Sequence, residues 1–455
     1  MKEKKNKKAE EEQKKVTDYK DDYPRWDNKT MKHTYKILAP DMLPWHFMII
    51  EGVIQAEGYD LEILRNDGRQ VVDEGLKHVH NDTCYPCLCV VGQFIDALHS
   101  GKYDLDHTAL MITQTGGGCR ASNYVPLIRK AIKNEFPNVP VVSINFSGLE
   151  SDSSFEFTIG LLLKVAYAIM YGDSVMWCYN QTKPYEMEEG ASDKARDEAV
   201  KYVTDIYKSH KGYSKYKKIN QKIIDIFSSV KITDEKKIKV GIVGEIYVKY
   251  SYLGNNNLEK FLLSEGCEPV VPALMDFVLY CIVNTVNDHK LYGHSRGKAI
   301  LYNLIYKFVH HMQKNIIKQF KKSRYEPLHD FDHIRACADK VINQGVKMGE
   351  GWLIPAEMAA CAETGVPNIV CAQPFGCLPN HIAGKGAIRT LKNMYQDENI
   401  VAVDYDPSAT RVNQENRIKL MLATARENFA REQAGKAAKA SAAETPAQEG
   451  AKAAE

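Results

Sequence analysis

The stretch of sequence that decides the fold is residues 108–134, which read TALMITQTGGGCRASNYVPLIRKAIKN. Residues 108–113 are apolar enough for a buried strand, and residues 121–134 place apolar side chains at helical spacing. The glycines between them permit a tight turn and let the backbone approach a bulky ligand. A strand that turns into a helix in this way predicts a unit of a parallel sheet, where ligands bind at the carboxyl ends of the strands. Cys119 lies at such an end.

The same alternation of strand, turn and helix continues on both sides of this unit. A polar, charged segment at 231–237 interrupts it, and a second series of strands begins at residue 238. Alternation of this kind is typical of βαβ units, so we predict an α/β fold of two parallel-sheet lobes with added helices. Strands are expected at 35–38, 59–64, 108–113, 139–144, 238–243, 269–271, 368–372 and 400–404.

Length and composition divide the chain into regions. At 455 residues the chain is too long for one ordinary core. We expect a first α/β lobe over residues 33–230 and a second over 231–430. Residues 1–32 are rich in Lys and Glu and predict a disordered charged tail, and residues 431–455 predict a low-complexity tail. The sequence shows no internal repeat of fixed period.

Charge and hydropathy argue against several classes of protein. The net charge of +2 gives no reason to expect a nucleic acid or an anionic membrane as partner. No apolar segment follows the charged first residues, so no secretory signal is expected. The most apolar run, residues 159–170, is interrupted by Lys164 and predicts a buried helix rather than a membrane span. We therefore expect a cytoplasmic protein.

The sequence contains 11 cysteines. Without an export signal, clustered cysteines are more often metal-binding or catalytic than disulfide-bonded. Cys84 and Cys87 are two residues apart at the predicted start of a helix, which suits two thiolates on one metal or a redox dithiol. Because His78 and His80 lie just upstream, a zinc site is an open alternative.

A third cysteine segment, QPFGCLPNH at 373–381, holds Cys377 between two prolines that fix the backbone. Thiolates from Cys84, Cys119 and Cys377 could hold an iron–sulfur cluster and leave one iron free to bind a substrate. A lone cysteine in a turn is the alternative for each of them. Cysteines in apolar or helical contexts predict structural thiols that pack as small hydrophobic groups; these are Cys178, Cys267, Cys281, Cys337 and Cys361.

Two acidic residues stand in or after glycine-bounded segments. Glu245 follows a predicted strand and Gly244, and Glu357 lies on the helix that follows GEGW at 349–352. Such carboxyl groups could polarise or deprotonate a substrate, and helix capping or solvation explains them equally well. The sequence has no Gly-Lys-Ser or Gly-Lys-Thr phosphate loop, so we do not expect ATP hydrolysis.

These segments together resemble a known family. The chain over roughly residues 33–425 resembles the cysteine-containing module related to components of 2-hydroxyacyl-CoA dehydratases. In larger bacterial proteins this module is fused behind the ATPase activator of those enzymes. The segments that carry the resemblance are ILAPDM at 37–42 with WHF at 45–47, NDTCYP at 81–86, TQTGGGCRASNY at 113–124, VGEIYVKY at 243–250, GEGW at 349–352 and QPFGCLPNH at 373–381.

The resemblance implies a site between two Rossmann-like lobes. An oxygen-sensitive 4Fe–4S cluster would be held there by Cys84, Cys119 and Cys377. Cys87 lies outside the shared pattern, which weakens the zinc and dithiol interpretations. In the dehydratases a partner ATPase supplies one electron to the cluster, which passes it to the thioester carbonyl of an acyl-CoA. The ketyl radical formed in this way then loses the hydroxyl group.

The sequence also departs from a working dehydratase, because it contains neither the ATPase half nor the two distinct subunits. We therefore expect a separate ATPase activator as partner, with an acyl-CoA as the candidate substrate. The expected function is that of a lyase of the dehydratase type or of an accessory electron-transfer component, with Glu245 and Glu357 as candidate catalytic residues. A non-catalytic iron–sulfur carrier or assembly protein and a zinc-binding structural module are the alternatives, because fold does not fix function.

Overall fold

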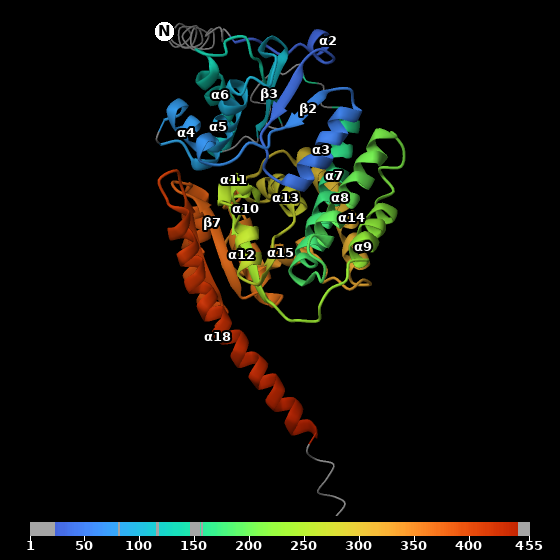
Figure 1. The fold of residues 1–455 in the computed structure, drawn as a ribbon, viewed down its shortest axis with the longest axis vertical. Coiled ribbons are helices and arrows are strands. Elements are labelled where there is room, and N and C mark those ends of the chain that lie inside the picture. The colour runs from blue at the N-terminus through green and yellow to red at the C-terminus, as the bar shows by residue number, and fades with distance from the viewer. Residues whose placement is uncertain (1–22, 81, 115–117, 146–154, 156–157, 445–455) are drawn as a thin grey trace, which may run out of the picture.

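The first lobe is built on a four-stranded parallel sheet. The structure is a computed structural model that describes residues 23–444 apart from 81, 115–117, 146–154 and 156–157, with the backbone alone for 145 and 437–444 (Figure 1). The strand order is β2-β1-β3-β4. The strands are β1 (Lys36–Ala39), β2 (Asp60–Ile63), β3 (Thr108–Gln114) and β4 (Val141–Asn145), and the helices of this lobe are α2 (Asn28–Met31), α3 (Pro44–Ala56), α4 (Arg69–His78), α5 (Tyr85–His99) and α6 (Tyr124–Ile132).

The second lobe repeats this construction with its own parallel sheet, in the order β6-β5-β7-β8. Its strands are β5 (Ile238–Gly244), β6 (Cys267–Val270), β7 (Asn368–Pro374) and β8 (Asn399–Tyr405). Its helices are α10 (Ile246–Tyr250), α11 (Tyr252–Asn255), α12 (Leu258–Ser264), α13 (Leu274–Tyr292), α14 (Arg296–Phe320), α15 (Phe331–Val341), α16 (Leu353–Glu363), α17 (Gly386–Met394) and α18 (Arg411–Glu444).

Both sheets have a central strand that is buried along its length. All residues of β7 are buried, and β3 exposes a single position. A parallel sheet is covered by helices on both faces, so its strands are continuous apolar runs rather than alternating ones. The predicted α/β fold with two parallel-sheet lobes is confirmed.

The two sheets share one topology. The order β6-β5-β7-β8 corresponds position by position to the order β2-β1-β3-β4, with β5 in the place of β1. In each sheet the second strand in the chain lies on one side of the first strand, and the third lies on its other side. This reversal creates a switch point, which is where α/β proteins bind ligands. Cys119 follows β3 and Cys377 follows β7, so the two cysteines come after corresponding strands.

A layer of long helices connects the lobes: α7 (Ile159–Asn180), α8 (Ala191–Lys208) and α9 (Tyr216–Ser228). Helix α7 contacts α3 of the first lobe and α13 of the second. Near its middle, buried Asp173 accepts hydrogen bonds from the backbone N–H groups of Leu274 (2.7 Å) and Met275 (3.0 Å) and lies 2.9 Å from His46 Nε2. One carboxylate thus caps α13 and contacts the first lobe.

Helix α7 is also the one described segment long and apolar enough to cross a membrane, with a mean hydropathy of 1.4 over its best window. Half of that window is buried inside the protein, and the buried residues lie toward the C-terminal end of the helix. The first turn differs from the buried helix that the sequence predicts, because Ile159 is 80% exposed. The packing of the remainder against α3, α8 and α9 is that of a core helix.

The chain ends differ from the expected tails. Trp26 is buried and α2 forms within residues 23–32, so this part of the predicted tail at 1–32 is folded. At the other end α18 continues to Glu444, well past residue 431, and extends away from the body of the protein (Figure 1). The remaining parts of the predicted tails, residues 1–22 and 445–455, lie outside the described residues.

Candidate functional site

Two of the three candidate cysteines begin helical segments in the first lobe. Cys84 is the N-cap of α5, with Pro86 in the first turn of that helix. Cys119 is the N-cap of the short 3-10 helix η2 (Arg120–Asn123), which leads into α6. Both side chains are only partly buried. Unpaired backbone N–H groups at such helix starts favour a thiolate.

The third cysteine comes from the second lobe. Cys377 follows β7 in the turn before a π-helix, η4 (Asn380–Lys385), and it is also partly buried. The preceding Gly376 has a φ of +74°, which favours glycine at this position. His381 N–H donates to Cys377 O over 3.0 Å and continues the turn into the helix. The sequence therefore builds a rigid, local support for this thiol.

Two of the three sulfur atoms have a side-chain hydrogen-bond partner. Tyr124 Oη lies 3.0 Å from Cys84 Sγ, and Asn380 Nδ2 donates to Cys377 Sγ over 3.3 Å. Donors of this kind stabilise sulfur that carries negative charge.

A pair of carboxyl groups from the second lobe faces these thiols. Glu245 is the N-cap of α10, and its Oε2 accepts a hydrogen bond from Val248 N–H over 2.9 Å. Glu350 is buried, and its Oε1 accepts one from Ile246 N–H over 3.1 Å. Burial, followed by the charge of Glu350, raises the pKa of Glu245 to about 8.

The charges of these carboxylates raise the pKa of all three thiols. Burial raises the pKa of Cys84, and the charge of Glu245 adds to it. Burial raises the pKa of Cys119 to about 12, with further contributions from Glu350, Glu245 and Cys84. For Cys377 burial, Glu245 and Glu350 act in the same direction. Residues from both lobes thus surround one region that is rich in acidic groups.

The loops around this region are closely packed. A Cβ atom on Gly118 would lie 2.5 Å from Met348 Sδ, and one on Gly349 would lie 2.9 Å from Pro379 Cγ. Gly349 also has a φ of +58°. Glycine is therefore favoured at position 349, where the segment before Glu350 meets the turn after Cys377, whereas at Gly118 the flexible Met348 side chain could move aside.

Glu357, the second candidate catalytic residue, has a different environment. Its carboxylate oxygens lie 3.0 and 3.1 Å from Lys249 Nζ, and both side chains are buried. Since Glu357 is 1% exposed, it does not reach a surface that a substrate could contact. The structure thus places Glu357 in a buried ion pair, and its catalytic role stays a prediction.

The zinc alternative at Cys84 and Cys87 finds no support in the neighbouring histidines. His78 Nε2 lies 3.0 Å from Glu135 Oε1, and its Nδ1 lies 2.8 Å from the backbone oxygen of Glu74. His80 is exposed, and Cys87 is fully buried. Within the part of the chain that the structure describes, these residues do not form a group of ligand atoms close enough to hold one metal ion.

The sequence pointed to the cysteines but missed several of their neighbours. Glu350 was visible only as part of GEGW at 349–352, and nothing in the spacing placed it near Glu245. Tyr124 and Asn380 lie inside the quoted cysteine segments, where their distances of five and three residues from Cys119 and Cys377 were the available signal.

Comparisons with known proteins add nothing to this geometry. No protein-family model matches the chain, and no curated protein matches it. The resemblance to dehydratase components therefore remains a prediction from the sequence.

Proposed function

We propose that the chain is an iron–sulfur protein of the 2-hydroxyacyl-CoA dehydratase type, in which Cys84, Cys119 and Cys377 hold a 4Fe–4S cluster. The observation that carries this proposal is the placement of three partly exposed thiols, two at helix starts of the first lobe and one after the central strand of the second. Hydrogen bonds to sulfur tune the reduction potential of a cluster, and Tyr124 and Asn380 supply such contacts to Cys84 and Cys377.

The separation of the three sulfur atoms argues against one shared zinc ion. The three sulfur atoms do not all lie within 4.8 Å of one another. One tetrahedral zinc ion would draw three thiolates to roughly 3.5–3.8 Å from each other, given its bond lengths. A cubane separates its cysteine sulfurs by roughly 6–7 Å. Three protein thiolates would also leave one iron of the cluster open to a substrate oxygen.

When bound, the cluster supplies one-electron reduction at low potential. The residues of the chain perform the remaining tasks. Tyr124 and Asn380 orient the thiols of Cys84 and Cys377 through the contacts described above. Glu245, whose pKa is raised to about 8 by burial and by the charge of Glu350, is proposed to give a proton to a departing hydroxyl.

The electron is proposed to come from a separate ATPase activator, because this sequence carries no phosphate loop of its own. The candidate substrate is an acyl-CoA thioester. All 11 cysteines are free of disulfides, which suits a reducing compartment and supports a cytoplasmic location as part of the proposal.

The test is anaerobic reconstitution of the full chain with iron and sulfide, followed by chemical analysis and electron paramagnetic resonance of the reduced protein. About four iron and four sulfide ions per chain are expected for a cubane. Cys119→Ser should lower the iron content or change the reduced spectrum. Cys178→Ser, at a fully buried cysteine on α7, should change neither. A protein that holds no iron, or equal iron and the same reduced spectrum in both variants, would refute the proposal.

A second measurement separates a catalyst from an electron carrier. Purified protein mixed with an ATPase activator and ATP should dehydrate a 2-hydroxyacyl-CoA if it is an enzyme. Reduction of the cluster without turnover would identify the chain as an iron–sulfur carrier.

A further inference from the structure

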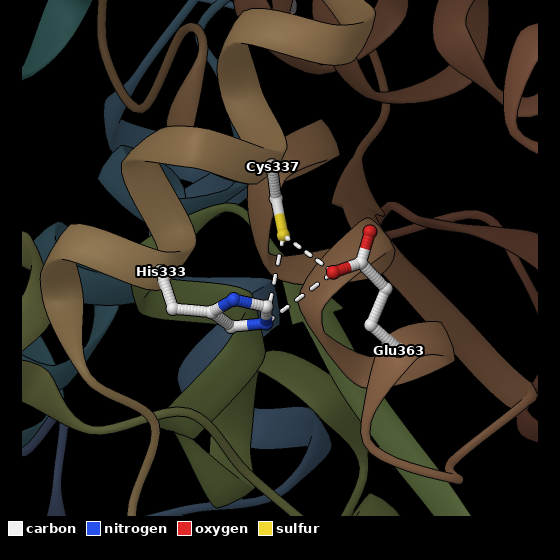
Figure 2. A group of neighbouring side chains, drawn as sticks. All are labelled: His333, Cys337 and Glu363. Carbon is white, nitrogen blue, oxygen red and sulfur yellow. Dashed lines mark hydrogen bonds and ion pairs between the residues drawn. The ribbon is translucent and has the colours of Figure 1, made fainter.

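A second group of metal-binding side chains lies on two neighbouring helices of the second lobe (Figure 2). His333 and Cys337 are one turn apart on α15, so they lie on the same side of that helix. Glu363 is the last residue of α16, which packs against α15. Figure 2 shows the imidazole, the thiol and the carboxylate pointing toward one common place.

The three donor atoms form a nearly equilateral triangle. Cys337 Sγ lies 3.7 Å from His333 Nε2 and 3.7 Å from Glu363 Oε2. The imidazole nitrogen lies 3.6 Å from the same carboxylate oxygen, which is too long for a hydrogen bond. Neighbouring ligand atoms around a tetrahedral zinc ion are roughly 3.3–3.6 Å apart, given its bond lengths of about 2.0–2.3 Å. The triangle therefore matches one face of such a tetrahedron.

The carboxylate is held in place by its other oxygen. Glu363 Oε1 accepts hydrogen bonds from Lys340 Nζ and from Tyr395 Oη, each over 2.5 Å. Oε2 is left to face Cys337 and His333. Fixing a ligating carboxylate through a hydrogen bond to its second oxygen is how proteins orient metal ligands.

A different trio, His310 with Asp330 and Asp332, is less suited to a metal ion. His310 Nε2 already lies 2.7 Å from Asp330 Oδ1. Lys314 Nζ lies 3.4 Å from Asp332 and 3.9 Å from Asp330. Tyr306 donates a further hydrogen bond to Asp332. No thiol takes part in this group.

We propose that His333, Cys337 and Glu363 bind a divalent transition metal ion, preferably Zn²⁺, with the fourth coordination position open to water or a small ligand. One imidazole, one thiolate and one carboxylate suit zinc or cobalt rather than magnesium or calcium. The side chain of His333 is 38% exposed, which gives an ion a route from solvent. The site shares no residue with Cys84, Cys119 or Cys377 and does not depend on the proposed function.

An ion at this position would join α15 to the C-terminal end of α16. Helix α16 begins shortly after Glu350 and carries Glu357, so the ion would brace the helix that supports the acidic part of the candidate cysteine site. Because only the folded chain brings these ligands together, binding should raise the unfolding temperature.

The test uses the full chain with Cys84→Ser, Cys119→Ser and Cys377→Ser combined, which removes the thiols proposed to hold iron. Anaerobic titration with Co²⁺ should bind one equivalent and produce the charge-transfer band of a single cobalt–thiolate bond. Zn²⁺ should displace the cobalt. His333→Ala should weaken binding by more than about 100-fold, since even the partners that orient metal ligands are worth roughly 10–100-fold. Tyr395→Phe should weaken it by about 10-fold or more.

His311→Ala, on an exposed part of α14, is the matched control and should leave cobalt binding unchanged. A second measurement uses the chain with all its cysteines. Zinc analysis should give one ion per chain, lost in His333→Ala while the iron content stays the same. Absence of the cobalt–thiolate band in a folded protein would overturn the proposal. So would a band of equal strength in His333→Ala or Cys337→Ser.

Discussion

Lys249 and Glu357 form a buried ion pair in the second lobe. Their side chains are 3% and 2% exposed, and the ammonium group contacts both carboxylate oxygens. A single charge at such a place would lack both water and a partner, which is costly in free energy. Each residue of the pair therefore needs the other for the stability of the fold.

Removing one partner of this pair should destabilise the protein. We expect Glu357→Ala to lower the free energy of unfolding by about 3–5 kcal/mol, because Lys249 would remain buried and unpaired. The double variant Lys249→Met with Glu357→Leu should recover most of this loss. Urea unfolding measures both. An unchanged unfolding curve for Glu357→Ala, together with lost turnover, would support the catalytic interpretation of this residue.

A second residue gives a dependence of stability on pH. Burial raises the pKa of Glu259, on α12, from 4.5 to about 7, and a hydrogen bond from Asn180 opposes the shift. The folded protein therefore keeps a proton that the unfolded chain releases between these pH values. Stability from this group is fully present below pH 4.5 and is lost as the pH rises through about 7.

Glu259→Gln should remove this dependence, because the amide cannot ionise. Relative to the variant, the natural protein should lose roughly 2–3 kcal/mol of stability between pH 4.5 and pH 8. Unfolding by urea at several pH values measures the difference. Parallel curves for the two proteins would show that Glu259 does not titrate in this range.

At the scale of elements, α4 and α5 cross where both have glycine. A Cβ on Gly92 would lie 1.9 Å from the backbone oxygen of Val71, and one on Gly75 would lie 2.3 Å from that of Leu88. Only glycine lets the two backbones approach this closely. Because Cys84 caps α5, this crossing also fixes the position of a candidate cluster ligand.

Gly92→Ala should therefore separate the two helices. We expect a loss of about 1–3 kcal/mol in stability from the enforced shift, with a lower iron content after reconstitution. Gly435→Ala is the control, since Gly435 lies in α18 with nothing within 4 Å of an added Cβ. That change should stabilise the helix slightly. Thermal unfolding and iron analysis give the comparison, and equal iron in both variants would contradict the link to Cys84.

The sequence predicted elements well where one local pattern governs them. The strand expected at 238–243 is β5, and the helix expected after Cys84 is α5. The sequence did not predict contacts between distant segments. Cys337 was interpreted as a structural thiol from its helical context and is buried, but its contact with Glu363 on another helix follows from no spacing rule. Cys281 was expected to be buried, yet the packing of α13 leaves it exposed.

At the scale of the whole molecule, α18 packs on the second lobe through its first half only. Ile418, Met421, Leu422 and Ala425 are buried, whereas most described side chains beyond them are exposed. The hydrophobic contribution of this helix therefore ends near residue 425, although the helix itself continues.

Two truncations should show which part of α18 stabilises the protein. Deleting residues 433–455 should leave the unfolding temperature unchanged, because the described part of this segment buries no large apolar side chain. Deleting residues 418–455 should cost several kcal/mol, at roughly 1.5–3 kcal/mol for each large apolar side chain exposed. Differential scanning calorimetry distinguishes the two. A large loss in the shorter deletion would show that the end of the helix has a folding role.

The sequence did not predict the repeated strand order, because no repeat of fixed period is visible in it. Topology depends on which edge of a sheet each helix returns to, and the two lobes achieve the same order with different residues and loop lengths. The corresponding positions of Cys119 and Cys377 after β3 and β7 follow from that order, and neither segment predicts them alone.

The joining of the lobes by one continuous chain has a further consequence for the candidate cysteine site. Cys84 and Cys119 belong to one half of it, and Cys377, Glu245 and Glu350 belong to the other. Because both halves are covalently linked, their encounter is unimolecular, and its effective concentration is set by the fold. Dilution that would dissociate a dimer of single-lobe chains leaves these two halves together.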